Sequence, residues 1–169
     1  KVFGEETRDR PFSENDAPNP QDEYARSKWA AEQSVIAATA STSCIAVIVR
    51  PPMVYGPDVR GNFPRLVRLI KSGIPLPLGA IDNRRTLVSV WNLCDLLERT
   101  AHLPARSGEI VLPMDDRSVS TPELLRLMAG AMALKVRLLN VPVRWLDILG
   151  RLSGRTEDVA RLTGSLELD

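Results

Sequence analysis

The chain has 169 residues, of which 44% are hydrophobic and 25% charged, as is usual for a globular domain with a hydrophobic core. Its 22 basic and 21 acidic residues give a net charge of +1, so the composition offers no field of one sign that would hold nucleic acid or an anionic membrane. The longest apolar runs are too short to span a bilayer, and the polar start predicts no signal peptide.

The first predicted elements are a loop, a helix and a strand. Residues 5–19 are polar and contain two prolines, which indicates a loop. Asn19-Pro20 is a typical helix start, and an Ala-rich helix with an apolar face is expected to about Ala40. The apolar run "CIAVIV" at 44–49 is typical of a strand buried in a parallel sheet. Two prolines end it, and the "MVYGPD" that follows is predicted to be a loop.

Helices and strands alternate in the rest of the chain. Ser120 and Glu123 have capping-box spacing, although Thr121 before Pro122 is an equally good N-cap, and the Leu and Met stripe that follows is expected to be core. Further helices are expected over 61–73, 92–103, 142–149 and near 157–162, and strands over 86–90, 108–113 and 135–141. The pattern predicts an α/β fold with part of a parallel sheet.

The cysteines and the histidine indicate no metal chemistry. Cys44 and Cys94 lie in apolar stretches, which predicts buried free thiols and a cytoplasmic, reducing location. His102 is the sole histidine, and a structural zinc site needs more ligands than these three residues supply. A cap or surface position is therefore the interpretation of His102, and no metal site is predicted.

Tyr24 and Lys28 stand four residues apart in the first predicted helix, so they project from one face. A phenol has a pKa of about 10, and a neighbouring ammonium or cationic cofactor ring favours its phenolate form. Such a phenol could exchange a proton with a substrate hydroxyl near neutral pH. Because Tyr-x-x-x-Lys also occurs by chance in many helices, the pair alone leaves a surface tyrosine beside a surface lysine as the alternative.

Other motifs accompany the pair in a fixed order: Val2-Phe3-Gly4 before it, then "CIAVIVRPP", "VYGP" and "NRRTLVSVWNLCDLL" after it. With these motifs the chain resembles the extended short-chain dehydrogenase/reductase family, in particular NAD-dependent epimerases and dehydratases of the UDP-glucose 4-epimerase-like kind. The resemblance implies that residues 1–60 are the C-terminal portion of a Rossmann-type doubly wound parallel sheet. Residues 61–169 would form mainly a smaller mixed α/β substrate-binding subdomain, with segments that return to the first domain.

The resemblance also implies how NAD is bound. Tyr24 would be the acid and base that acts on the sugar hydroxyl. Lys28 would bind the nicotinamide ribose and favour the phenolate. Pro51, just after the strand, would pack near the nicotinamide end of the cofactor.

For the substrate, the resemblance points to a diphospho-sugar. Arg85 would bind its diphosphate, because a planar guanidinium suits two phosphate oxygens. Asn62 stands at the start of a substrate-side helix, whose amides favour anions. The alternatives are that Asn62 is only an N-cap and that Arg85 forms a solvated pair with Arg84.

The implied activity is 4-epimerisation of a nucleotide sugar, as in polysaccharide biosynthesis, with no nucleic acid and no membrane span involved. An NAD(P)-dependent 4-keto-sugar reductase and a non-catalytic NAD-binding regulatory module are the alternatives. Met53 and Asn92 replace the Asn and Asp of many relatives, which leaves a lipid-linked diphospho-sugar open.

The family's glycine-rich dinucleotide motif and the Ser or Thr of its catalytic set do not occur in these residues. We therefore expect the chain to be the C-terminal part of a longer protein and to be inactive by itself. Relatives commonly dimerise through the helix that carries Tyr and Lys, so a homodimer is expected for the full-length protein.

Overall fold

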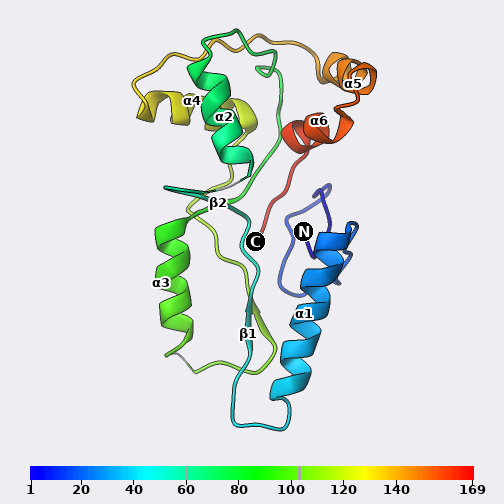
Figure 1. The fold of residues 1–169 in the computed structure, drawn as a ribbon, viewed down its shortest axis with the longest axis vertical. Coiled ribbons are helices and arrows are strands. Elements are labelled where there is room, and N and C mark those ends of the chain that lie inside the picture. The colour runs from blue at the N-terminus through cyan, green and yellow to red at the C-terminus, as the bar shows by residue number, and fades with distance from the viewer. Residues whose placement is uncertain (60, 103) are drawn as a thin grey trace. The chain divides into compact units, whose positions relative to one another are not determined.

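A computed structural model describes residues 1–59, 61–102 and 104–169, apart from the side chain of Asn62. The chain forms two compact units: unit 1 comprises Lys1–Gly56, Thr86–Arg117 and Leu166–Asp169, and unit 2 comprises Pro57–Arg85 and Ser118–Ser165. The elements in chain order (Figure 1) are α1 (Glu23–Thr39), β1 (Val47–Val49), β2 (Met53–Tyr55), α2 (Asn62–Lys71), β3 (Leu87–Ser89), α3 (Val90–Thr100), β4 (Glu109–Val111), α4 (Thr121–Ala131), α5 (Val143–Leu152) and α6 (Thr156–Thr163).

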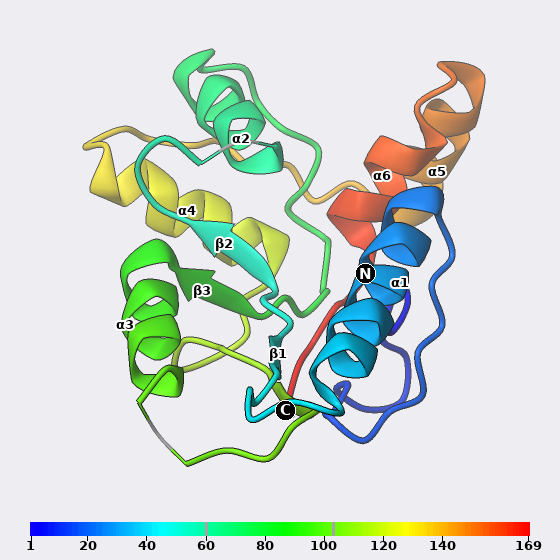
Figure 2. The same cartoon turned by 60° about the horizontal axis from the view of Figure 1, so that its bottom comes forward.

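Unit 1 contains two pairs of parallel strands. β1 pairs with β4, with Ile48 opposite Ile110, and β2 pairs with β3, with Val54 opposite Val88. Ile48 and Val88 are buried, as expected for apolar strands of a parallel sheet. The chain is therefore α/β with parallel strand pairing, as its sequence predicts. Figure 2 shows helix α3 directly after β3 and alongside it.

The segment that was predicted to be a loop after the two prolines contains a strand instead. Pro51 and Pro52 end β1, because proline lacks the N–H that a central strand needs. The chain then forms β2 in a different pair of strands. Periodicity could not indicate this strand, because three residues are too few to show alternation.

The strand predicted over 135–141 is also wrong. The described residues there form a single bridge, Leu76 to Leu138, with Leu139 donating its N–H to the Leu76 carbonyl at 2.8 Å. Pro75 and Pro77 flank Leu76 and lack the N–H groups that would extend the ladder. Leu76 also donates to the Arg137 carbonyl and Gly79 to the Leu139 carbonyl, at 2.8 and 2.9 Å, but the prolines prevent these bonds from extending into a strand.

Helix α1 begins at Glu23, three residues later than its predicted start. The side chain of its N-cap, Asp22, accepts a hydrogen bond of 2.6 Å from the N–H of Ala25. Ala25 is the one residue of this helix that is buried. The expected apolar face consists of Trp29, Val35 and Ile36; Trp29 and Val35 are 37% and 49% exposed, so this face is largely open in unit 1.

Unit 2 is built from two helix pairs, α2 with α4 and α5 with α6. The Ser120 hydroxyl caps α4 by accepting from the N–H of Glu123, which confirms the predicted helix start. Leu124, Leu125 and Met128 are buried, so the apolar stripe of α4 is core, as predicted. Within the described residues, no helix is long and apolar enough to cross a membrane.

The cysteines differ from their prediction in one respect. Cys44 and Cys94 are free, but both are exposed rather than buried. Cys44 lies in the turn before β1, and Cys94 lies on an outward face of α3. The apolar neighbours that suggested burial belong to the adjacent strand and to the other face of the helix.

Candidate active site

Tyr24 and Lys28 lie on one face of α1. The Lys28 amine stands 5.5 Å from the centroid of the Tyr24 ring, within the usual range of a cation–π contact. Tyr24 is 60% exposed and Lys28 is also exposed, so both polar ends reach solvent. A phenol and an ammonium are thus held together on an accessible surface, as a proton-transfer pair requires.

Arg50 and Glu32 fix α1 to the end of β1. The guanidinium donates two hydrogen bonds, Nε to Oε1 at 3.1 Å and one terminal nitrogen to Oε2 at 2.7 Å. Only 9% of the Arg50 side chain and 14% of the Glu32 side chain are exposed. The same guanidinium lies 4.4 Å from the centroid of the Phe3 ring. Pro51 follows directly and is exposed at the strand end.

This ion pair could not be predicted from the sequence, because its two partners are 18 residues apart in different elements. A charged residue at the end of a buried strand could have suggested a partner but not its identity. The pair matters for the site because Glu32 lies one helical turn beyond Lys28. It therefore positions the part of α1 that carries the phenol and the ammonium.

A second polar cluster joins the ends of β2 and β3 to the segment after β4. The Tyr55 hydroxyl donates to Asp115 at 2.6 Å, and the same carboxylate accepts from the Asn92 amide at 2.8 Å and from the Ser89 N–H at 3.2 Å. The hydrogen bond to Asp115, with burial, raises the pKa of Tyr55 to about 12. Burial opposes the charge of Asp115, but the hydrogen bonds from Tyr55, Asn92 and Ser89 outweigh it and lower the pKa of Asp115.

Asn92, noted above as a departure from many relatives, has a role in this cluster. Its side-chain amide donates to Asp115. An aspartate at the same position would place two carboxylates side by side, which is unfavourable for both. The sequence analysis missed Asp115 itself, because nothing local marks a residue that meets Tyr55 from 60 positions away.

Arg85 is turned inward in unit 2. Its backbone forms a two-way bridge with Val119 at 2.9 Å, and one terminal nitrogen of its guanidinium donates to the Arg161 carbonyl of α6. Its Nε is buried and has no hydrogen-bond partner among the described residues. Burial lowers the pKa of Arg85. Arg84 is exposed, so the two arginines do not form the solvated pair that was the alternative.

A buried amide supports the segment that leads to Arg85. The Asn83 side chain donates to the carbonyls of Leu162 and Gly164 at 3.2 and 3.0 Å and accepts from the Thr121 N–H at 2.8 Å. Asn83 is 2% exposed, so these bonds replace its contacts with water. The cluster fixes Arg85 between α4 and α6 within unit 2.

The predicted site residues are divided between the two units. Tyr24, Lys28 and Pro51 belong to unit 1, and Asn62 and Arg85 belong to unit 2. Asn62 is the first residue of α2, after the N-cap Gly61, so it is not the cap. Its side chain lies outside the described residues.

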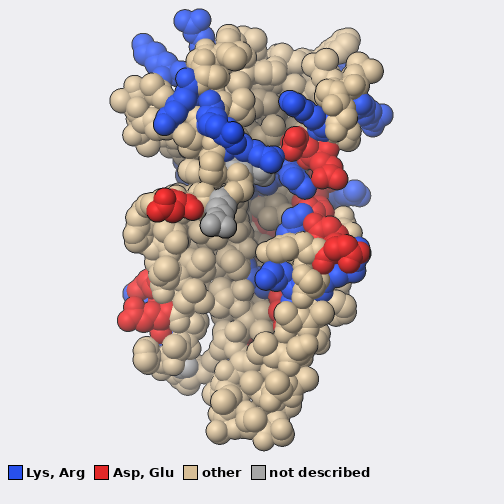
Figure 3. All heavy atoms as spheres, in the orientation of Figure 1, with Lys and Arg blue, Asp and Glu red and all other residues tan. Residues whose placement is uncertain are grey.

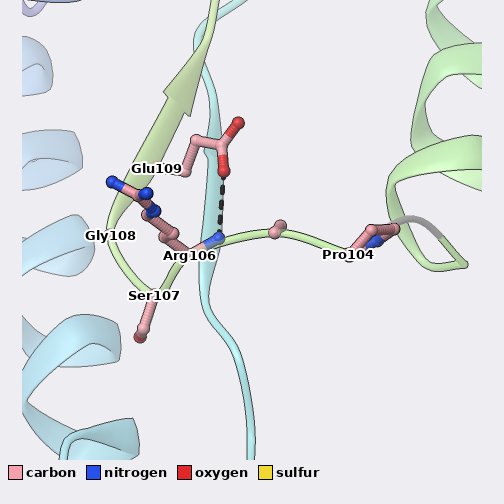
Figure 4. A pocket seen from close by; sticks show the side chains of 6 residues that line it. Pro104, Arg106, Ser107, Gly108 and Glu109 are labelled. Atoms are coloured by element: carbon pink, nitrogen blue, oxygen red, sulfur yellow. Dashed lines mark hydrogen bonds between the residues drawn. The ribbon is translucent and has the colours of Figure 1, made fainter.

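A pocket in unit 1 is lined by residues 104–109, the turn that leads into β4 (Figure 4). The Arg106 N–H donates to the Glu109 carboxylate at 3.0 Å across this turn. None of the predicted site residues lines the pocket. We therefore place the candidate active site on α1 and not here.

Comparisons with known proteins identify relatives of known activity. The model of the "NAD dependent epimerase/dehydratase family" matches residues 1–111. A UDP-glucose 4-epimerase of Vibrio cholerae is 41% identical over 160 residues, which cover 94% of this chain and 49% of that protein. The N-acetyl-alpha-D-glucosaminyl-diphospho-ditrans,octacis-undecaprenol 4-epimerase of Escherichia coli O157:H7 is 25% identical over 154 residues, 89% of this chain and 45% of that protein. The chain thus spans about half the length of these relatives.

Solved structures share the fold. The UDP-glucose 4-epimerase of Thermotoga maritima, solved with UDP-glucose, matches with a TM-score of 0.71 at 16% identity and covers 99% of this chain and 51% of that chain. The dTDP-glucose 4,6-dehydratase DesIV of Streptomyces venezuelae, solved with NAD, matches with a TM-score of 0.68 at 21% identity and covers 99% and 48%. At such identities the likeness concerns the fold alone.

Proposed function

This chain belongs to the NAD dependent epimerase/dehydratase family, and we propose that the full protein is an NAD-dependent 4-epimerase of nucleotide sugars, with UDP-glucose and UDP-galactose as substrates. The observation that carries the proposal is the exposed Tyr24–Lys28 pair on α1. The 41% identity to a UDP-glucose 4-epimerase supports the choice of substrate.

The residues on α1 fit the nicotinamide end of NAD. Lys28 offers an exposed ammonium that would donate hydrogen bonds to the ribose hydroxyls, beside the Tyr24 phenol. When bound, NAD would supply the reversible oxidation of C4. Pro51, exposed at the end of β1, would contact the nicotinamide end.

Tyr24 would accept and return the proton of the sugar C4 hydroxyl. Its phenolate oxygen accepts the proton of the sugar C4 hydroxyl and later returns it to the oxygen on the inverted carbon. On the substrate side, Arg85 would bind the diphosphate, for which its buried and unpaired Nε is a suitable donor. Asn62 at the start of α2 would assist, since helix N-termini favour anions.

Substitution Tyr24→Phe in the full-length protein tests the assignment. We expect kcat for epimerisation to fall by about 10²- to 10⁴-fold, the usual contribution of a general acid or base. The circular dichroism spectrum should be unchanged, because Tyr24 is 60% exposed. Arg26→Ala is the matched control, since Arg26 is an exposed residue of the same helix turn. Epimerisation at the wild-type rate in Tyr24→Phe contradicts the proposal.

Cofactor absorbance separates the alternatives. An epimerase regenerates NAD in every turnover, so no net change in reduced cofactor is expected. A 4-keto-sugar reductase would consume reduced cofactor in proportion to product. A regulatory module would bind NAD without turnover, which equilibrium binding would reveal.

A lipid-linked diphospho-sugar is the second candidate substrate. The relative from Escherichia coli O157:H7 is by name a 4-epimerase of an undecaprenol-diphosphate sugar. Met53 and Asn92 stand where many UDP-sugar enzymes have Asn and Asp, and this difference favours a substrate other than a UDP-sugar. Epimerisation assays with a panel of UDP-sugars and an undecaprenyl-diphosphate sugar decide between the two.

We also propose that the full protein is a homodimer that uses α1. The exposure of Trp29 and Val35 on this Ala-rich helix supports an interface. Covering these apolar side chains with a second subunit would remove apolar surface from water and so stabilise a dimer. Light scattering would measure the mass. A monomer at micromolar concentration contradicts this proposal without affecting the assignment of Tyr24.

A further inference from the structure

Helix α5 carries an apolar stripe on its outer face. Trp145, Ile148, Leu149 and Leu152 are 52%, 45%, 57% and 81% exposed. Their spacing of three, four and seven residues places all four on one side of the helix. A single exposed leucine is common on protein surfaces, but four large apolar side chains in one row indicate a surface that binds a partner.

The opposite face of α5 packs within unit 2. Leu146 and Gly150 are buried, and α5 packs against α6. The contact at Gly150 is close, since an added Cβ would lie 2.8 Å from the Cγ2 of Val159. This packing fixes the rotation of α5 about its axis. The stripe therefore cannot turn inward without breaking the α5–α6 contact.

The charge of the chain is unevenly divided between its units. Unit 2 contains 13 Lys and Arg against 6 Asp and Glu, a formal net charge of +7, whereas unit 1 contains 9 against 15, a net charge of −6. The net charge of the whole chain is close to zero because the basic unit 2 and the acidic unit 1 nearly cancel. This corrects the expectation from composition that no field of one sign is available for an anionic membrane.

Basic residues lie directly beside the stripe. Arg144 and Arg151 are exposed on the edge of α5 next to it, and Asp147 is the sole acidic residue of this helix. In Figure 3 the surface over α5 is mostly tan, with blue Lys and Arg spheres beside it and red Asp and Glu spheres below it towards α6, and further blue spheres gather over α2 and α4 of the same unit. The face therefore combines apolar side chains with Arg144 and Arg151 along one edge.

We propose that α5 docks unit 2 onto the surface of an anionic lipid bilayer. The four apolar side chains would enter the boundary between headgroups and acyl chains, with Arg144 and Arg151 at the phosphates. This is the composition of an interfacial amphipathic helix, in which tryptophan and leucine face the lipid and arginine faces the headgroups. With 10 residues, α5 lies in the interface and does not span it.

Charge favours this occupant over a second copy of the chain. A symmetric contact through α5 would bring together two units that each carry +7, and like charges across an interface are unfavourable. An anionic bilayer offers the complementary sign. The other open helix face, on α1, differs in both respects, because it is rich in alanine and belongs to the acidic unit.

Sedimentation with vesicles tests the proposal and does not depend on the enzymatic activity. The full-length protein would be mixed with vesicles of phosphatidylglycerol and phosphatidylethanolamine, and in parallel with vesicles of phosphatidylcholine alone. We expect binding to the anionic vesicles that weakens as salt is raised. The double variant L149S/L152S should bind at least about tenfold more weakly, because it removes two apolar side chains that would be buried in the bilayer.

Two further variants sharpen the test. R144A/R151A should weaken binding to anionic vesicles roughly 25-fold, since each arginine near such a surface contributes about fivefold. The matched control is Leu127→Ser, which replaces an equally exposed leucine of α4 (53% exposed) in the same unit and should bind as the wild type does. All of these side chains are exposed, so the variants should fold, which circular dichroism checks.

Any of three results would overturn the proposal: no binding of the wild-type protein to anionic vesicles, binding that L149S/L152S retains in full, or equally strong binding to phosphatidylcholine. If vesicle binding is absent, light scattering can show a dimer that L149S/L152S abolishes. That last result assigns the face to a second copy of the chain.

Discussion

Tyr24 and Tyr55 are the two tyrosines of the chain, and their surroundings differ. Tyr24 lies on the surface beside an ammonium, whereas Tyr55 donates its proton to a carboxylate at 2.6 Å. The carboxylate holds the Tyr55 proton in place, so Tyr55 is unsuited to act as a base near neutral pH. Position in the structure thus separates a candidate catalyst from a structural phenol.

The hydrogen bond of Tyr55 makes stability depend on pH in the alkaline range. Its pKa is raised from about 10 to about 12 in the folded state, so its stabilising contribution is complete below pH 10 and is lost as the pH rises through 12. We expect the free energy of unfolding of wild type to fall more steeply between these pH values than that of Tyr55→Phe. Urea denaturation across this range measures it, and equal slopes would contradict the hydrogen bond.

Local spacing explains which site residues the sequence could predict. The i, i+4 placement of Tyr24 and Lys28 follows from helix geometry alone, and the structure has both side chains on one face. The partnership of Tyr55 with Asp115 joins residues 60 positions apart, and no local rule pairs them. The catalytic and cofactor-binding roles of Tyr24, Lys28 and Pro51 stay predictions.

At the scale of elements, a largely buried ion pair joins α1 to the end of β1. Ala25 is the one buried residue of this helix, and the pair of Arg50 with Glu32 adds a polar contact to the strand. Removing one partner of such a pair leaves an unpaired buried charge, which typically costs 3–5 kcal/mol. The position of the candidate catalytic residues therefore rests on a contact outside the site.

We expect Glu32→Ala to lower the free energy of unfolding by about 3 kcal/mol, measured by urea denaturation. Glu23→Ala is the matched control on the same helix. Its pair with Arg26 is exposed, at 90% and 50% of the two side chains, so a loss of less than about 1 kcal/mol is expected. Equal losses in the two variants would show that the Arg50 pair does not anchor the helix.

The start of α4 could be predicted from its cap, whereas strand β2 could not be predicted, although the strands expected over 86–90 and 108–113 contain β3 and β4. The Ser120 hydroxyl begins α4 as the capping pattern indicates, because the cap and the capped N–H are three residues apart. Strand β2 was missed because its partner, β3, lies more than thirty residues away. The alternation at 135–141 was misleading because a strand needs a neighbour whose backbone can pair with it.

At the scale of the whole chain, the predicted boundary at residue 60 lies near Gly56, where the first segment of unit 1 ends, and later segments return to unit 1. Unit 1 takes three separate segments, and its strands β1 and β2 find their partners in the second of them. The assignment of a cofactor part and a substrate part stays a prediction. So does the cytoplasmic location.

This connectivity predicts that residues 1–60 do not fold alone. Both parallel partners, β3 and β4, lie beyond residue 60, so the piece has unpaired strands and one largely exposed helix. We expect its circular dichroism spectrum to show a disordered chain with at most partial helix, whereas the 169-residue chain gives an α/β spectrum. Cooperative thermal unfolding of the 1–60 piece would contradict this view.

The two ends of the chain meet in unit 1, where Phe12 pairs with Leu168 and the N–H of Leu168 bonds to the Thr86 hydroxyl at 2.9 Å. These bonds join segments that lie far apart in the sequence, and most of the residues between them belong to other parts of unit 1 and to unit 2. Because Phe12 is synthesised long before Leu168, this part of unit 1 is expected to form late, after the residues of unit 2 have been made.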